Sequence, residues 1–131
     1  MLLPTTERLK RGRAAVISCE RRDCNICLSA CGFTAIRRGD DGAPFSDPGK
    51  CVGCGGCCAI CPDMAIRLIK DRGDGSYELT LPYDGALPEI GDTVAVSPLT
   101  GGGAGPARVI QAVPKRPNAY SALVRAVADF I

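Results

Sequence analysis

The second half of the chain alternates apolar and polar residues with the period of β-strands. Between residues 77 and 81, apolar side chains at the odd positions alternate with Glu78 and Thr80, which predicts a strand with one buried face. The sequence DRGDGS at residues 71–76 is typical of a hairpin turn leading into that strand. The same kind of pattern predicts further short strands at residues 66–70, 93–96 and 108–113.

The last segment, residues 120–131, is compatible with two periods. Leu123, Val127 and Ile131 recur at helical spacing, whereas apolar residues at the even positions from 122 to 128 would line one face of a strand. We expect a strand that passes into a helical end. With the strands before it, this segment would complete a small antiparallel sheet or partial barrel.

The first half of the chain contains an internal duplication. Sliding the sequence by 30 positions lays residues 24–36 over residues 54–66, and three cysteines and a closing Ala-Ile pair coincide. Each copy is predicted to fold as a loop, a short helix and a strand. The connector between the copies, residues 39–50, is rich in turn residues and has no periodicity, so we expect it to run over the surface.

Composition and charge exclude several functions. The 131 residues carry a formal net charge of only +2 and few aromatic side chains, which disfavours nucleic-acid binding. The chain has no histidine, which excludes histidine-ligated haem, Rieske centres, two-histidine zinc sites and a Ser-His-Asp triad. Residues 1–38 hold eight basic residues against three acids, which indicates either a docking surface or a solvated face.

The pattern of charged and apolar residues predicts neither export nor membrane insertion. Residues 1–13 are rich in charge and have no apolar core of the kind found in signal peptides. No apolar run reaches membrane-spanning length, since Arg125 and Asp129 interrupt the C-terminal one. We therefore expect a protein of the reducing cytoplasm.

The cysteines supply the chemistry. All nine lie between residues 19 and 61, spaced C-x4-C-x2-C-x3-C and then C-x2-C-x2-C-x3-C-P. Cysteines with two residues between them allow one loop to curl around an inorganic core, so the spacing predicts two iron-sulfur clusters. Paired C-x2-C elements also bind structural zinc, and a zinc-binding interaction module remains an alternative. The odd count and the absence of a secretory signal disfavour a disulfide framework.

With these motifs, residues 14–70 resemble the bacterial two-cluster ferredoxins. The resemblance implies an α+β fold: a pseudo-symmetric core with two cysteine motifs, followed by a small antiparallel β appendage. It also implies two 4Fe-4S clusters with crossed ligation, in which the fourth cysteine of each motif serves the other cluster. The implied ligands are Cys19, Cys24, Cys27 and Cys61 for one cluster, and Cys51, Cys54, Cys57 and Cys31 for the other. The chain then divides into a basic extension (1–13), a two-cluster domain (14–70) and a β-rich appendage (71–131).

The chain departs from the ferredoxin pattern at its first arm, and it carries one additional cysteine. Four residues, 20–23, separate the first two cysteines where two are usual, so this arm is expected to bulge outward with Arg21 and Arg22 exposed. Such spacing also occurs in plant-type 2Fe-2S ferredoxins, but those have no use for the second complete motif. The ninth cysteine, Cys58, is interpreted either as a small buried apolar residue or as a ligand in place of Cys57.

The expected function is electron transfer without catalysis. The sequence holds no nucleophile-base pair and no flavin or nicotinamide fingerprint. The ferredoxin motifs together with the stretch TLPYDGALPEIGDTVAV at residues 80–96 resemble the small iron-sulfur subunits of FAD-dependent dehydrogenases acting on proline, hydroxyproline or opine-type amino acids. That resemblance implies a hetero-oligomer with a flavoprotein dehydrogenase subunit. A free-standing soluble ferredoxin is the alternative within electron transfer.

Overall fold

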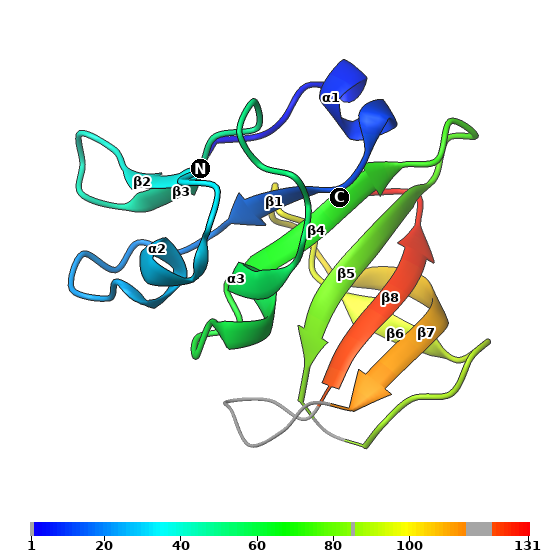
Figure 1. The fold of residues 1–131 in the computed structure, drawn as a ribbon. Helices are drawn as coiled ribbons and strands as arrows, with labels where there is room; N and C mark the ends of the chain where they lie inside the picture. The colour runs from blue at the N-terminus through cyan, green and yellow to red at the C-terminus, as the bar shows by residue number, and fades with distance from the viewer. Residues whose placement is uncertain (1, 85, 115–121) are drawn as a thin grey trace.

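The computed structural model describes residues 2–84, 86–114 and 122–131, and it has the predicted α+β architecture (Figure 1). Its helices are α1 (Thr6–Arg11), α2 (Ile26–Ala30) and α3 (Gly56–Ile60). The larger sheet contains β1 (Ala14–Ile17), β4 (Ile66–Asp71), β5 (Tyr77–Tyr83), β6 (Thr93–Val96), β7 (Gly105–Pro114) and β8 (Ala122–Ala128). The smaller sheet pairs β2 (Ile36–Arg38) with β3 (Pro44–Ser46).

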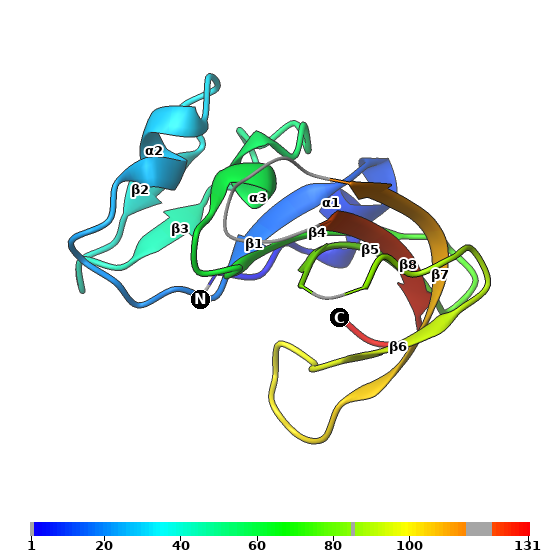
Figure 2. The same ribbon diagram turned by 90° about the horizontal axis from the view of Figure 1, so that it is seen from below.

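One antiparallel sheet connects the cysteine-bearing half of the molecule to the later strands. Its order is β1-β4-β5-β8-β7-β6, so β1 and β4 lie between α2 and α3 on one side and β5 to β8 on the other (Figure 1). The later strands curve away from the cysteine-bearing half (Figure 2). Within the described segments β1 and β6 are the edges of this sheet, and the barrel is not closed. The predicted boundary between residues 70 and 71 therefore falls at the last residue of a strand, β4, that both halves use.

The strands β1 and β4 are buried on both faces because each face covers a different core. Val16 and Ile69 pack with β5 to β8 in an aliphatic core. Ile17 and Leu68 face the other way and pack with cysteine side chains in a second core. All four residues of β1 are buried, which explains why its sequence, AAVI, is uniformly apolar rather than alternating.

The structure confirms strands at all four predicted positions before residue 114. The strand β6 has the predicted bounds, while β4 is one residue longer than predicted, β5 two and β7 four. The strand β7 begins three residues early, at Gly105, because Gly105 and Pro106 pair with Val96 and Ala95 despite their weak strand propensity. A register shift between Val109 and Gln111 then bends β7 along β8.

Two expectations are corrected. Residues 122–128 form the strand β8, and residues 129–131 do not continue into a helix; residues 120 and 121 lie outside the described part of the chain. Pairing with both β5 and β7 decides this conformation. The connector 39–50 is also not wholly a surface loop, since Pro44 and Ser46 of β3 are buried.

The basic extension forms a short helix that docks on the sheet. The Thr5 hydroxyl accepts a hydrogen bond from the Arg8 N–H at 3.2 Å, and this N-cap starts α1. Leu9 on its inner face is buried in the aliphatic core. Among the described segments, no helix has the length and apolar character needed to span a bilayer.

Candidate metal centres

The internal duplication is reproduced in the backbone hydrogen bonds. At the end of α2 the Cys31 N–H donates to the Cys27 carbonyl at 3.2 Å, and at the end of α3 the Cys61 N–H donates to the Cys57 carbonyl at 3.1 Å. The described residues other than glycine with a left-handed backbone are Thr34 and Met64, which are also 30 positions apart and share a φ of 52°. Each motif therefore places its third and fourth cysteines at the two ends of one helical turn.

Four cysteines line a cavity beside α2. They are Cys19, Cys24, Cys27 and Cys61. Three come from the first motif and the fourth comes from the second. The remaining wall is largely apolar, with Ile17 and Ile66 at its base.

The other four motif cysteines line a second cavity beside α3. They are Cys31, Cys51, Cys54 and Cys57. Here the second motif contributes three thiols and the first motif one. Ala15 and Leu68 form the base of this cavity. The structure thus brings together the same two groups of cysteines that the resemblance implied, each group around its own cavity.

The donor chemistry of both cavities fits an iron-sulfur cluster, which thiolates hold, because four sulfurs surround each void. Within the residues that the structure describes, no three Cys, His, Asp or Glu side chains form a ready-made site for a single ion. Burial raises the pKa of the Cys57 thiol to about 12, and the neighbouring Cys51 thiol adds to the shift. Burial also raises the pKa of Cys27. Burial thus favours the protonated thiols, whereas a bound cationic metal core would favour the thiolates.

Backbone N–H groups reach two of the sulfurs. The Ala15 N–H donates to the Cys51 Sγ at 3.4 Å, and the Arg21 N–H donates to the Cys19 Sγ at 3.3 Å. Such contacts orient a thiolate and offset part of its negative charge. The strand β1 therefore supplies both an apolar wall and a hydrogen-bond donor to the second cavity.

Each cavity also has an arginine that clamps the loop around it. The Arg8 guanidinium donates to the Cys51 carbonyl at 2.6 Å and to the Pro48 carbonyl at 2.7 Å. Beside the first cavity, Arg38 donates to the carbonyl of Cys24 and, at 2.7 Å, to that of Gly42. Sequence reasoning missed both roles, because the acceptors are backbone carbonyls of distant loops.

We expect Arg8→Gln to lower the free energy of unfolding by about 2–4 kcal/mol, because several charge-assisted hydrogen bonds to carbonyls are lost at once. Arg8→Lys should recover only part of this loss, since an ammonium group lacks the planar fork of donors. Urea titration of the anaerobic protein measures the change. Lys10→Gln, at an exposed position of the same helix, is the control and should change stability by less than about 0.5 kcal/mol.

The glycine between the first two cysteines of the second motif is required by its surroundings. Gly53 has a φ of +73°, and a Cβ there would lie 2.5 Å from the Arg13 carbonyl oxygen. This close approach holds the Cys51–Cys54 loop against the start of β1.

Gly53→Ala should therefore destabilise the protein by at least about 2 kcal/mol, through backbone strain and the clash with Arg13. Gly73 is a matched control, because its φ is +82° but no atom lies within 4 Å of the Cβ position. If Gly53→Ala and Gly73→Ala lost stability equally, backbone strain alone would explain the loss in Gly53→Ala, with no contribution from the clash with Arg13. Thermal unfolding followed by circular dichroism makes the comparison.

The longer arm of the first motif is exposed, as predicted. Arg21 and Arg22 are both on the surface. Arg21 bonds Asp23 at 3.2 Å and Asp63 at 2.9 Å, so the arm is tied to the residues that follow Cys61. The Arg21 guanidinium holds the pKa of the Asp23 carboxyl below its usual value.

The ninth cysteine lies away from both cavities. Cys58 is buried in the cysteine-containing core, and its Sγ lies 3.2 Å from the Ile66 carbonyl oxygen. Cys57, by contrast, lines the second cavity. This placement favours the interpretation of Cys58 as a packing residue on the inner face of α3.

Comparison with known proteins finds one informative similarity. Over 45 residues, 34% of this chain, the sequence is 42% identical to one subunit of the Na(+)-translocating ferredoxin:NAD(+) oxidoreductase complex of Acetobacterium woodii. The aligned part is 14% of that subunit, so the chain spans only a small fraction of its relative's length. No protein-family model matches the chain, and no solved structure matches it.

Proposed function

We propose that this chain transfers electrons through two 4Fe-4S clusters, one held by each set of four cysteines. The observation that carries the proposal is the pair of cavities, each lined by three thiols of one motif and the fourth thiol of the other. When bound, each cluster supplies a site that takes up and releases one electron. Similarity to a subunit of an oxidoreductase complex supports the same class of function.

The chain's own contribution is to hold thiolates and exclude water. Ile17 and Ile66 line the first cavity, and Ala15 and Leu68 line the second. Because these four residues alternate along β1 and β4 on one face, a single apolar wall serves both cavities. This wall would fix the separation of the clusters and limit solvent reorganisation during electron transfer.

A more specific proposal is that the chain is the small subunit of a flavin-dependent amino-acid dehydrogenase in the cytoplasm. It is supported by the resemblance at residues 80–96 and by the surface of that stretch. Leu87 and Ile90, between β5 and β6, are 49% and 76% exposed. Large apolar side chains exposed together in one loop are typical of a protein contact. The partner would then be a flavoprotein that passes electrons to the clusters.

Metal analysis of anaerobically purified protein tests the cofactor. Two cubanes require about eight irons and about eight acid-labile sulfides per chain, with broad absorption at roughly 400 nm. A colourless protein with stoichiometric zinc would instead establish the zinc-binding alternative, since zinc has a closed d shell.

Copurification tests the partner. When the chain is expressed with its neighbouring genes and isolated by a tag, a stable complex with a flavin-containing chain is expected. A monodisperse monomer with full redox activity would establish the free-standing ferredoxin instead.

A further inference from the structure

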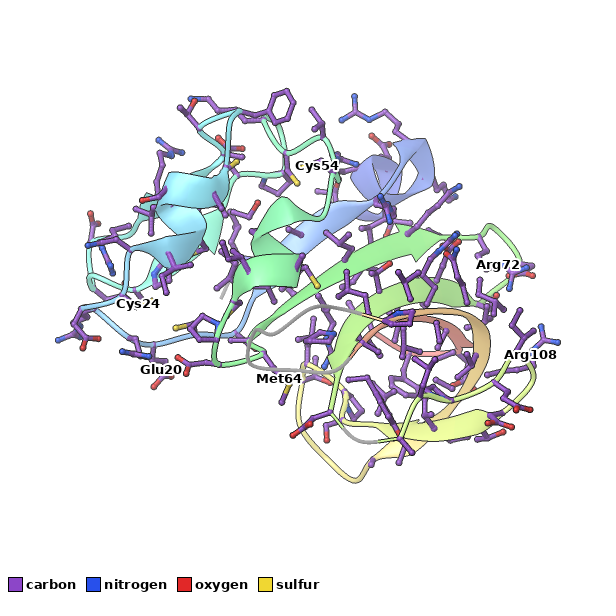
Figure 3. The ribbon with its side chains drawn as sticks, turned by 60° about the horizontal axis from the view of Figure 1, so that its bottom comes forward. Glu20, Cys24, Cys54, Met64, Arg72 and Arg108 are labelled. Atoms are coloured by element: carbon purple, nitrogen blue, oxygen red, sulfur yellow. The ribbon has the colours of Figure 1, made fainter. Side chains whose placement is uncertain are left out.

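The two cavities are not equally covered by protein. Among the nine cysteines, all of which are described, Cys54 is the exposed one; the others are buried or half-buried. It belongs to the second cavity, and Figure 3 shows it well apart from Cys24 on the half of the molecule that carries α2 and α3. A ligand at the surface gives the shortest path for an electron between a cluster and a partner.

Apolar side chains surround this exposed cysteine. Phe33 and Val52 line the same cavity and are 52% and 57% exposed. Phe33 follows the last cysteine of the first motif and Val52 follows the first cysteine of the second, so the fold brings side chains of both motifs to one surface. An exposed apolar centre of this kind is typical of a protein-contact surface, where removing water strengthens electronic and electrostatic contact.

Basic residues flank the apolar centre. Lys50 is exposed and adjoins Cys51 in the chain, and Arg13 packs against Gly53. Arg11 lies one helical turn from Arg8, whose guanidinium contacts the Cys51 carbonyl. The nearby acid Asp47 is already bonded to Arg37 at 3.3 Å.

The surface over the first cavity carries charges of both signs. Asp63 lines that cavity and bonds Arg21, which also bonds Asp23. Arg21 is thus paired with two carboxylates, and because Glu20 and Arg22 are exposed on the same arm, this surface offers little net charge to attract a partner. The asymmetry between the cavities is one of both exposure and charge.

We propose that electrons enter and leave this chain through the surface formed by Phe33, Val52 and Cys54, and that this surface docks an acidic patch of a redox partner. We call it the Cys54 face. The proposal rests on the proposed function, because it assumes a cluster in the second cavity. Charge complementarity selects the partner, since Lys50, Arg11 and Arg13 would raise the local concentration of an acidic protein and orient it.

Two small oxidants of opposite charge locate the exchange site. Dithionite-reduced protein is mixed by stopped flow with the trianion tris(oxalato)cobaltate(III) or the trication hexaamminecobalt(III). In each case one electron leaves the protein and cobalt(III) becomes cobalt(II). At low ionic strength the trianion should react faster than the trication after correction for their reactivities with a neutral reductant, and added salt should reduce the difference.

Charge reversal identifies which surface is responsible. Lys50→Glu should lower the ratio of trianion to trication rate constants by about tenfold at low ionic strength. Arg22→Glu is the matched control, because Arg22 is exposed on the arm beside the first cavity, and it should change the ratio by less than about twofold. The proposal would be overturned if Arg22→Glu changed the ratio of rate constants more than Lys50→Glu does, or if Lys50→Glu left that ratio unchanged.

A polyanionic peptide tests whether a macromolecule binds the same surface. Poly-L-glutamate should slow oxidation of the wild-type protein by the trianion and have little effect on Lys50→Glu, whereas poly-L-lysine should not protect either protein. Equal protection of both proteins would place the acidic partner elsewhere. Iron and sulfide are measured in every sample: protein without clusters contradicts the proposed function, whereas fully loaded protein with no effect of Lys50→Glu contradicts only the Cys54 face.

Discussion

Cys61→Ala should halve the iron content, and adding Cys24→Ala should lower it no further. The two residues belong to different motifs but line the same cavity, so one cluster is lost in the single variant and in the double variant alike. Combining Cys61→Ala with Cys54→Ala should remove both clusters, because Cys54 lines the other cavity. Iron per chain measures each step: about eight in the wild-type protein, about four in the variants that lose one cluster, and none in the variant that loses both.

If each motif instead held its own cluster with its own four cysteines, the two double variants would exchange their iron contents. Cys54 and Cys61 belong to one motif and would then hold one cluster, so their double variant would keep about four irons while Cys24→Ala with Cys61→Ala would lose all of them. Cys58→Ala is the internal control. Its thiol lies toward the Ile66 carbonyl rather than in a cavity, and this variant should keep about eight irons if it folds.

Local patterns predicted those parts of the fold that local physics determines. Alternation along residues 77–81 follows from one face of β5 packing in the aliphatic core, and each repeated motif forms one helical turn with the same backbone hydrogen bond. The two crossed sets of cysteines were implied by the resemblance to two-cluster ferredoxins, and the structure groups the thiols in the same way around two cavities; that each set binds a cluster stays a prediction.

Long-range pairing determined what the sequence did not predict. The strand β3 has the short sequence PFS, and it is a strand because it pairs with β2. The sequence after residue 120 has both a helical and a strand period, and residues 122–128 form a strand because they pair with β5 and β7. Arg8 resembled a solvated charge because its acceptor, the Cys51 carbonyl, lies 43 positions away.

Removal of the metal should unfold the half of the molecule that carries α2 and α3 and leave the outer sheet largely intact. The core of that half consists of cysteine side chains and a few aliphatic residues of β1 and β4. Without metal, the eight motif thiols around the two cavities lose the bonds that would join the two motifs, and metal-thiolate bonds supply much of the folding free energy of small metal-binding domains. Helices of five residues such as α2 and α3 are not stable alone.

The outer strands have a different source of stability. The strands β5, β7 and β8 pair along most of their lengths and bury an aliphatic core that contains none of the motif cysteines. Each fully buried leucine or valine in such a core contributes roughly 1.5–3 kcal/mol by leaving water. This core does not depend on metal, so its amides should keep their protection after the clusters are gone.

Hydrogen exchange followed by mass spectrometry separates the two halves. After anaerobic chelation, peptides covering α2 and α3 should exchange as fast as in denaturant, while those covering β5 and β8 should remain protected by at least about tenfold. Unchanged protection in α2 and α3 would show that packing holds the cavities open without metal. Loss of protection throughout would show that β1 and β4, which both cores share, transmit the collapse to the whole sheet.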